Sequence, residues 1–281
     1  TERKDTLMLD AILWPLIALG GLGLVLGLGL AIASKIFEVK VDPKVEQVRE
    51  LLPGANCGGC GFPGCDGLAK AVVSGEKDAG ACVAISCDNL AAIGALLGVD
   101  TTPSEPNVAR VRCHGDSENC ISKYTYTGIH DCRAAAMLAG GPSACAFGCV
   151  GLLTCGKVCP FGAIYLSDKG IAAVDESLCT GCGRCEAICP KHVITVMPKS
   201  RRVFVACRTN EKGKAAAAIC KAGCIACGLC AKKCPEGAIT MKDNLPVIDY
   251  EKCTGCGVCA SVCPKGSIAI NDEKNANICA G

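Results

Sequence analysis

The sequence predicts an α+β fold in which small domains are built around iron–sulfur clusters and follow a single N-terminal transmembrane helix. Three observations support this prediction. The chain has 281 residues and 27 cysteines, and 20 of the cysteines fall into five runs of four with the spacing of iron–sulfur ligands. Residues 11–34 carry no charge, and a cysteine-rich segment is repeated in the C-terminal half.

The composition favours small cluster-bound domains over one large hydrophobic core. Aromatic residues make up only 4% of the chain, and there are 34 glycines. Metal binding would therefore supply much of the folding free energy. Disulfides are the rival use of the cysteines, but their number is odd and no cleavable secretory signal is evident. A formal net charge of +2, without an aromatic and basic stripe, gives no reason to expect nucleic acid as a partner.

Residues 1–37 are predicted to form a transmembrane anchor. Its 24 uncharged residues would span about 36 Å as a helix, against about 30 Å of hydrocarbon. A signal peptide would have a shorter apolar stretch and a small-residue cleavage site. Here four basic residues follow instead: Lys35, Lys40, Lys44 and Arg49. By the positive-inside rule they place the cysteine-rich part in the cytoplasm, so the expected location is the inner (cytoplasmic) membrane of a prokaryote.

Residues 38–99 are predicted to form a small helical [4Fe–4S] domain. Val45, Val48, Leu51 and Leu52 share one face of a short helix, and Asp66 is a candidate cap for the next helix. The pattern C-x2-C-x4-C-x16-C supplies four thiolates for one cluster: Cys57, Cys60, Cys65 and Cys82. Structural zinc is the alternative for four thiolates, and the cysteine runs further along the chain disfavour it.

Two connecting segments follow, at residues 100–144 and 201–223. The first begins with a polar, proline-marked linker, after which residues 108–113 alternate like a strand. The second contains another alternating strand, residues 201–207, and an alanine-rich helix at residues 214–219.

Two tandem units are predicted at residues 145–200 and 224–281. Cys159-Pro-Phe-Gly-Ala-Ile is followed by a cysteine run that starts at Cys179, and Cys234-Pro-Glu-Gly-Ala-Ile by one that starts at Cys253. A proline follows the fourth cysteine of four runs, where its fixed φ turns the chain away from the cluster. Each unit resembles a bacterial two-cluster ferredoxin, which implies the ferredoxin-like α+β fold.

In two-cluster ferredoxins the fourth cysteine of each run binds the other cluster. The resemblance therefore implies four ligand sets. They are Cys224, Cys227, Cys230 and Cys263; Cys253, Cys256, Cys259 and Cys234; Cys179, Cys182, Cys185 and Cys159; and Cys145, Cys149, Cys155 and Cys189. The run from Cys145 to Cys159 departs from the family because its spacing is stretched.

Seven cysteines remain outside these sets. Each unit is preceded by one strand cysteine, Cys113 or Cys207, and one helix cysteine, Cys132 or Cys220. We predict that these four hold a further cluster between the units, which gives six [4Fe–4S] clusters and 24 ligands. The alternative is four inert buried thiols. The spare cysteines would be Cys87, Cys120 and Cys279, with Cys120 as the substitute for Cys113 or Cys132.

The order of the motifs resembles the B subunits of the Rnf complex. It runs from a membrane helix through Leu-Leu-Pro-Gly-Ala-Asn-Cys-Gly-Gly-Cys-Gly-Phe-Pro-Gly-Cys and Tyr124-x-Tyr126-x-Gly128-x-x-Asp131-Cys132 to tandem ferredoxin units. That complex is a membrane-bound ferredoxin:NAD oxidoreductase coupled to Na⁺ or H⁺ export. The resemblance implies an electron-transfer subunit of a translocase. Reduced soluble ferredoxin would donate electrons, which would pass to other Rnf membrane subunits and to the flavin and NAD subunits.

The residues agree with that role on separate grounds. No Ser-His-Asp set, phosphate loop or paired carboxylate stands out, and an electron carrier needs no catalytic pocket of its own. The cluster of the first domain is the predicted exit to the membrane. Four lysines are predicted to attract an acidic ferredoxin, although they could be ordinary solubilising residues: Lys232, Lys233, Lys252 and Lys265.

Two other functions fit part of the pattern. One is the iron–sulfur subunit of a different membrane redox complex. The other is a corrinoid iron–sulfur protein, which shares the Cys-Gly-Gly-Cys-Gly segment. That family needs a large corrinoid-binding barrel, for which no stretch of this chain has room.

Overall fold

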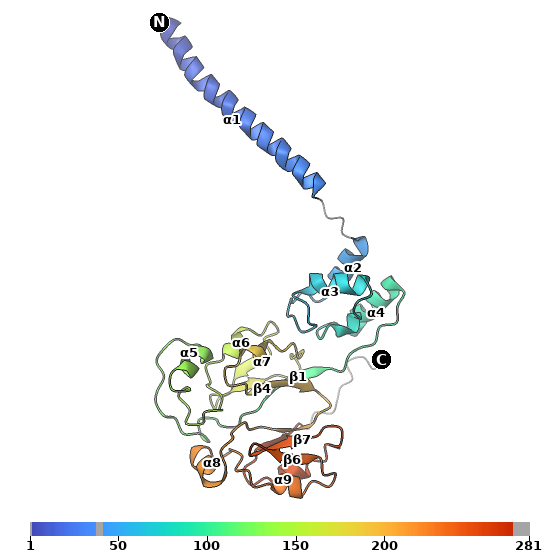
Figure 1. Ribbon diagram of the computed structural model, residues 1–281, viewed down its shortest axis with the longest axis vertical. Helices are drawn as coiled ribbons and strands as arrows, with labels where there is room; N and C mark the ends of the chain where they lie inside the picture. Colours follow the sequence, from blue (N-terminus) through green and yellow to red (C-terminus); the bar gives the residue numbers. More distant parts are fainter. Residues whose placement is uncertain (1, 38–41, 272–281) are drawn as a thin grey trace. The chain divides into compact units, whose positions relative to one another are not determined.

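The computed structural model describes residues 2–37 and 42–271 of the chain (Figure 1). The chain divides into two compact units, residues 1–43 and 44–281. In the first unit, helix α1 covers Glu2–Ile36. Its segment Trp14–Ile36 has 23 residues with a mean hydropathy of 2.4, and none of it is buried. A helix that is apolar all round and this long suits a lipid environment, as the sequence predicts. Of the four basic residues used for the orientation, Lys40 lies outside the described residues.

The second unit begins with a small helical domain. Its α-helices are α2 (Pro43–Leu51), α3 (Cys65–Val73) and α4 (Cys87–Leu97), and a 3-10 turn covers Ala79–Ala81. The predicted cap of α3 is wrong: Asn56 Oδ1, not Asp66, accepts a hydrogen bond from the backbone N–H of Cys65, at 2.9 Å. Asp66 instead pairs with Arg49 at 2.6 Å, which ties α3 to α2.

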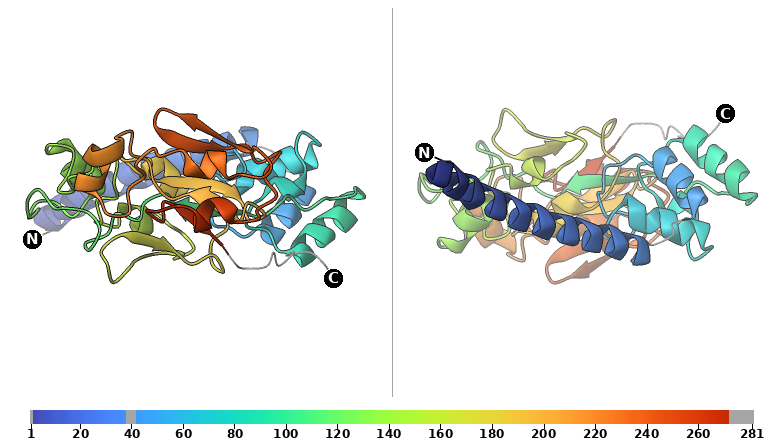
Figure 2. Two further views of the ribbon diagram at one scale, coloured as in Figure 1. Left: turned by 90° about the horizontal axis from the view of Figure 1, so that it is seen from below. Right: turned by 90° about the horizontal axis from the view of Figure 1, so that it is seen from above.

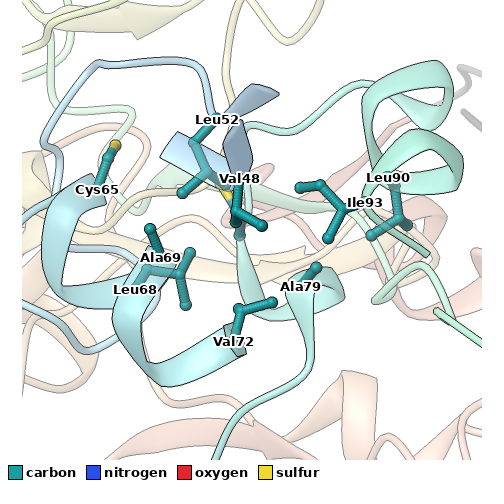
Figure 3. Close-up of a cluster of buried hydrophobic side chains, with 10 residues drawn as sticks. Val48, Leu52, Cys65, Leu68, Ala69, Val72, Ala79, Leu90 and Ile93 are labelled. Carbon is teal, nitrogen blue, oxygen red and sulfur yellow. The ribbon is translucent and has the colours of Figure 1, made fainter. Parts of the chain in front are cut away.

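The core of this domain is formed by side chains of its three helices. Val48, Leu68 and Ile93 point toward one another and are almost completely buried (Figure 3). Cys65 and Cys82 belong to the same buried cluster. Two of the four candidate ligands are therefore held by the packing of the helices themselves.

Residues 107–271 contain two copies of one plan. The first copy has strands β1 (Asn107–Val111), β2 (Ile164–Leu166), β3 (Ala172–Val174) and β4 (Ile194–Pro198), with helices α5 (Cys132–Met137), α6 (Thr154–Lys157) and α7 (Arg184–Ile188). The second has strands β5 (Val203–Val205), β6 (Ile239–Lys242), β7 (Leu245–Ile248) and β8 (Ile268–Ile270), with helices α8 (Gly213–Ile219), α9 (Leu229–Lys232) and α10 (Val258–Ser261).

In each copy the first strand pairs with the last and the two middle strands form a hairpin. β1 pairs antiparallel with β4, from Asn107 opposite Pro198 to Val111 opposite Ile194, and β2 pairs with β3. The second copy repeats this with β5–β8 and β6–β7. The strands predicted in the two connecting segments thus each become the first strand of a ferredoxin-like unit. Cys113 and Cys207 follow these two strands by two residues.

Contacts between the two copies include one between their first strands and one at the end of α8. Arg110 of β1 forms a buried ion pair with Glu176 and lies 5.3 Å from the ring centre of Phe204 of β5. At the other contact, the chain around Cys120 runs beside the end of α8, which is the orange helix in Figure 2. There the N–H of Ile121 donates to the carbonyl of Ile219 at 3.2 Å, and Cys120 and Cys220 form an antiparallel bridge.

Candidate iron–sulfur cluster sites

The first cysteine group lies in the helical domain, where the structure brings the four candidate ligands near one another. Cys57 and Cys60 lie in the loop before α3, Cys65 is the first residue of α3, and Cys82 follows the 3-10 turn. Burial raises the pKa of the Cys82 thiol, and the neighbouring charges of the other three cysteines raise it further. The four sulfurs are thus close enough to act on one another.

The second group lies at the start of α7 and in the loop before it. Burial raises the pKa of Cys185 to about 12, with Cys179 and Cys182 as the next causes. The charge of Cys159 in turn raises the pKa of Cys182. Gly183, in the left-handed region at φ 81°, turns the chain from the loop into the helix. The backbone N–H of Ala109 donates to Cys179 Sγ at 3.4 Å, so β1 supplies a hydrogen bond to this group.

Two groups lie in the second ferredoxin-like unit. One lines a partly open pocket and contains all four predicted cysteines: Cys224, Cys227, Cys230 and Cys263. In the other, burial raises the pKa of Cys259 to about 11, and Cys253 and Cys234 raise it further. Cys256, the fourth member predicted for that set, is exposed, as is Cys227.

The fifth group differs from the prediction in one member. The cysteines that line its cavity are Cys132, Cys149, Cys155 and Cys189, and Cys145 is not among them. Burial raises the pKa of Cys155 to about 12, followed by the charges of Cys149, Cys132 and Cys189. The reason for the difference is a hydrogen bond. The backbone N–H of Cys132 donates to Thr154 Oγ1 at 2.7 Å, which holds the start of α5 against the start of α6.

The sixth group lies between the two units, as predicted, but Cys145 replaces Cys132 in it. The cysteines that line its cavity are Cys113, Cys145, Cys207 and Cys220. Burial raises the pKa of Cys113 to about 12, and Cys149 and Cys145 add to the effect. Burial also raises the pKa of Cys145, which interacts with Cys207 across the boundary.

The internal repeat indicates that Cys145, rather than Cys132, belongs to the sixth group, which we call the central group. Cys145-x3-Cys149 has the same spacing as Cys220-x3-Cys224, so Cys145 and Cys220 occupy equivalent positions in the two units. The structure repeats this equivalence in its hydrogen bonds. The N–H of Cys149 donates to Cys113 Sγ at 3.4 Å, and that of Cys224 donates to Cys207 Sγ at the same distance. The central group therefore takes one strand cysteine and one loop cysteine from each unit.

The remaining cysteines include one that touches the central group. Cys120 Sγ lies 3.1 Å from Ser143 Oγ. A hydrogen bond between the thiols of Cys120 and Cys220 lowers the pKa of Cys120 and raises that of Cys220. Cys87 begins α4, and Cys279 lies outside the described residues.

Three family models match the chain, and all three describe iron–sulfur proteins. They are "Putative Fe-S cluster" at residues 52–84, "LdpA Fe-S cluster-binding domain" at residues 141–200 and "4Fe-4S dicluster domain" at residues 223–267. The matches fall on the helical domain and on the two ferredoxin-like units. The chain therefore carries iron–sulfur domains, one of them a [4Fe–4S] dicluster domain.

Curated relatives match most of the chain. The B subunit of the Na⁺-translocating ferredoxin:NAD⁺ oxidoreductase complex of Acetobacterium woodii is 45% identical over 245 residues, which are 87% of this chain and 74% of the relative. The B subunit of the proton-translocating ferredoxin:NAD⁺ oxidoreductase complex of Clostridium ljungdahlii is 42% identical over 242 residues, 86% of this chain and 85% of the relative. The chain belongs to the Rnf complex B subunits.

A third member of the Rnf B family extends the range of organisms. The B subunit of the ion-translocating oxidoreductase complex of Methanosarcina acetivorans is 42% identical over 196 residues, 70% of this chain and 74% of the relative. Membership in the Rnf B family, together with the apolar helix α1, supports a membrane-anchored protein. It also sets aside the corrinoid protein as an interpretation of the Cys-Gly-Gly-Cys-Gly segment.

Proposed function

We propose that this chain is the membrane-anchored electron-transfer subunit of an Rnf-type ion-pumping ferredoxin:NAD oxidoreductase. It would accept electrons from reduced soluble ferredoxin and pass them to the membrane partners of the complex. The observation that carries the proposal is that a chain of this family matches three iron–sulfur domain models and brings its cysteines together in common cavities. A [4Fe–4S] cluster bound by each group would supply one-electron redox chemistry.

The proposed ligand sets follow the arrangement in the structure. They are Cys57, Cys60, Cys65 and Cys82; Cys159, Cys179, Cys182 and Cys185; Cys132, Cys149, Cys155 and Cys189; Cys113, Cys145, Cys207 and Cys220; Cys224, Cys227, Cys230 and Cys263; and Cys234, Cys253, Cys256 and Cys259. Thiolates are the donors that iron–sulfur clusters take, and backbone N–H groups already point at several of these sulfurs.

The separation of the sulfurs favours clusters over single zinc ions. Zinc draws four sulfurs to about 2.3 Å from one point. Among residues 2–37 and 42–271, no three histidine, cysteine, aspartate or glutamate side chains are close enough together to hold one metal ion. A cubane instead takes each thiolate on a different iron, so its ligands stand further apart. The cavities lined by four cysteines fit that wider arrangement.

The protein's own part in the function is to hold, space and shield its redox centres. Short helices and left-handed glycines aim the thiolates inward, and apolar residues such as Ile239 and Ile268 exclude water from the second unit. Exposure of Cys227 and Cys256 makes that unit the more open end of the protein to a soluble partner.

Ferredoxin is the proposed donor, and the C-terminal unit is its proposed docking face. Lys232 and Lys233 are exposed at the end of α9, next to the group that contains Cys227, and Lys265 lines the same cavity. Lys252 is already paired with Asp249 at 3.2 Å, so its charge is partly neutralised. The other three lysines leave net positive charge beside this group, which would steer an acidic protein toward it.

Helix α1 would anchor this electron carrier with its cysteine-bearing part in the cytoplasm. Lys35 in the last turn of α1, followed by Lys44 and Arg49, supports that orientation. The first cysteine group follows the anchor most closely in sequence and is the proposed exit to the membrane partners.

Metal analysis of the anaerobically purified chain tests this function. About 24 iron and 24 acid-labile sulfide atoms per chain are expected, four of each for every cluster. Zinc without iron would overturn the proposal. Purifying the complex through a tag on this chain is the complementary experiment, and Rnf-type flavin and membrane subunits should accompany it. Subunits of a different redox complex would contradict the Rnf assignment.

A further inference from the structure

The loop between Cys57 and Cys60 contains a glycine that faces another cysteine group. A Cβ atom placed on Gly59 would lie 3.0 Å from the Cα atom of Cys182 and 3.3 Å from its Cβ atom. It would also lie 2.8 Å from Cγ2 of Val83 in its own domain. The backbone of the helical domain therefore touches the ligand loop of the first ferredoxin-like unit, with no space for a side chain between them.

An independent observation places the two cysteine groups next to each other. Burial raises the pKa of Cys182, and among the cysteines Cys57 is the first charged neighbour that adds to the effect, ahead of Cys159 and Cys179. Cys57 therefore lies near enough to Cys182 for its charge to act on that thiol. Cys182 is the residue that Gly59 contacts, and Cys57 precedes Gly59 by two residues.

The Cys182 loop is held from its other side as well. A Cβ atom on Gly181 would lie 2.5 Å from the Cβ atom of Asn107 and 2.7 Å from its carbonyl carbon, so the start of β1 supports this loop. A side chain at residue 59 could not be accommodated by moving the Cys182 loop toward β1. It would have to move the helical domain away.

We propose that the contact between Gly59 and Cys182 is the electron-transfer junction between the helical domain and the first ferredoxin-like unit, and that glycine at residue 59 sets the distance across it. The proposal rests on the proposed function. The step is a one-electron exchange in which one centre is oxidised and the other reduced, with no proton or further reactant. The rate of electron tunnelling falls steeply with distance. Because glycine has no side chain, residue 59 would keep the two centres close and the rate of transfer high.

Substitutions at residue 59 in the full-length protein test the junction. Gly59→Val adds a branched side chain at the contact. Gly59→Ala combined with Val83→Ala adds one methyl group and removes the clash inside the helical domain, so that Cys182 remains the close neighbour. Gly67→Ala is the matched control, because it lies in the same domain and its new Cβ atom would meet only Pro63 and Phe62 at 3.4 Å or more.

The readout is magnetic coupling between the two reduced centres, measured by EPR on dithionite-reduced protein with equal iron content. Variants that lack one group, Cys57→Ser with Cys60→Ser or Cys179→Ser with Cys185→Ser, supply the uncoupled reference spectra. The wild-type protein and Gly67→Ala should show the coupled component. Gly59→Val should lose it, and the double variant should weaken it.

Two outcomes would overturn the junction: no coupled component in the wild-type protein, or full coupling in both the Gly59→Val and the double variant. If Gly59→Val fails to bind its full iron complement, the coupling measured in the double variant tests the proposal. Iron-free wild-type protein would instead contradict the proposed function itself, so the two failures can be told apart.

Discussion

At the residue scale, Arg112 is one of two arginines, with Arg208, that line the cavity of the central cysteine group. It precedes Cys113 in the chain and lines the same cavity, and its Nε donates to the carbonyl of Val205 at 3.0 Å. Burial and the nearby Arg208 lower its pKa, while Cys207 opposes that shift. The guanidinium group is thus held beside the proposed cluster at some energetic cost.

This placement predicts an effect on redox potential. A fixed positive charge stabilises the reduced, more negative state of a cluster, so Arg112→Gln should lower the midpoint potential of the central centre. A potentiometric titration followed by EPR measures the shift. Arg49→Gln, which removes a charge from the helical domain, should leave this centre unchanged. An unaltered potential in Arg112→Gln would contradict the role given to this residue.

Single cysteine substitutions can test the revised ligand sets. We expect Cys145→Ala and Cys207→Ala to remove the same EPR signal, because both residues line the central cavity. Cys132→Ala and Cys149→Ala should remove a different one. Each variant should lose about four irons per chain.

Cys120→Ala serves as the control for these substitutions, since Cys120 contacts the central group without lining its cavity. It should retain the full iron complement. If Cys145→Ala and Cys149→Ala instead remove the same EPR signal, the two residues bind one cluster, as the ferredoxin pattern predicts.

At the scale of elements, the ferredoxin-like units are made of pieces too small to be stable alone. Helices α6, α9 and α10 have four residues each, and the sheets of the described residues have two strands each. Isolated helices of this length and single two-stranded sheets are marginal in water. Three of the eight residues in the core of the first unit are cysteines. Cluster binding would therefore hold these elements together.

The helical domain depends less on its cysteines. Helices α3 and α4 have nine and eleven residues, and only two of the ten residues in its core are cysteines. Full burial of a Leu, Ile or Val side chain stabilises a fold by about 1.5–3 kcal/mol, and this core contains several.

Removal of iron should therefore affect the two parts differently. After chelation under mild oxidation, limited trypsin digestion should degrade residues 107–271 first, and a fragment that contains residues 44–99 should persist longer. The loaded protein, digested in parallel, should resist cleavage in both regions. Simultaneous loss of the two regions after chelation would show that the apolar core of the helical domain is not sufficient.

At the scale of the whole molecule, five of the six cysteine groups are connected by direct interactions in one order. The group with Cys224 meets the central group through the N–H of Cys224 and the sulfur of Cys207, and the central group meets the next through Cys149 and Cys113. The charge of Cys155 raises the pKa of Cys185, and the charge of Cys57 raises the pKa of Cys182. These interactions define a continuous series from the C-terminal unit to the helical domain.

The series predicts that the central group is an obligatory step. In Cys207→Ala, reduced ferredoxin should still reduce the centres of the C-terminal unit, whereas the centre of Cys57, Cys60, Cys65 and Cys82 should stay oxidised on the wild-type time scale. Freeze-quench EPR can follow the reduction of the C-terminal centres and of the helical-domain centre separately. Dithionite, which reaches every centre from solution, should reduce both and so verify that the remaining clusters are intact. Reduction of the first group at the wild-type rate would show that electrons bypass the central group.

Much of this organisation could be predicted from the sequence. The cysteine runs gave the donor chemistry, the apolar stretch gave the anchor helix, and the offset repeat gave two similar units. The strands before Cys113 and Cys207 were also predicted, although not their pairing with β4 and β8, because strand pairing joins segments far apart in the chain. The cap of α3 was missed for a similar reason, since Asn56 bonds to Cys65, nine positions further along the chain.

The sequence by itself determined which atoms are available to bind metal and how the close ones are spaced, because spacing within a run is fixed by the covalent chain. Only the tertiary structure decided which distant cysteines share a site. Cys132 joins Cys149 through the contact of α5 with Thr154, and Cys145 joins Cys113, Cys207 and Cys220 where the two units meet. Such groupings depend on packing and hydrogen bonds between remote segments, which local spacing does not specify.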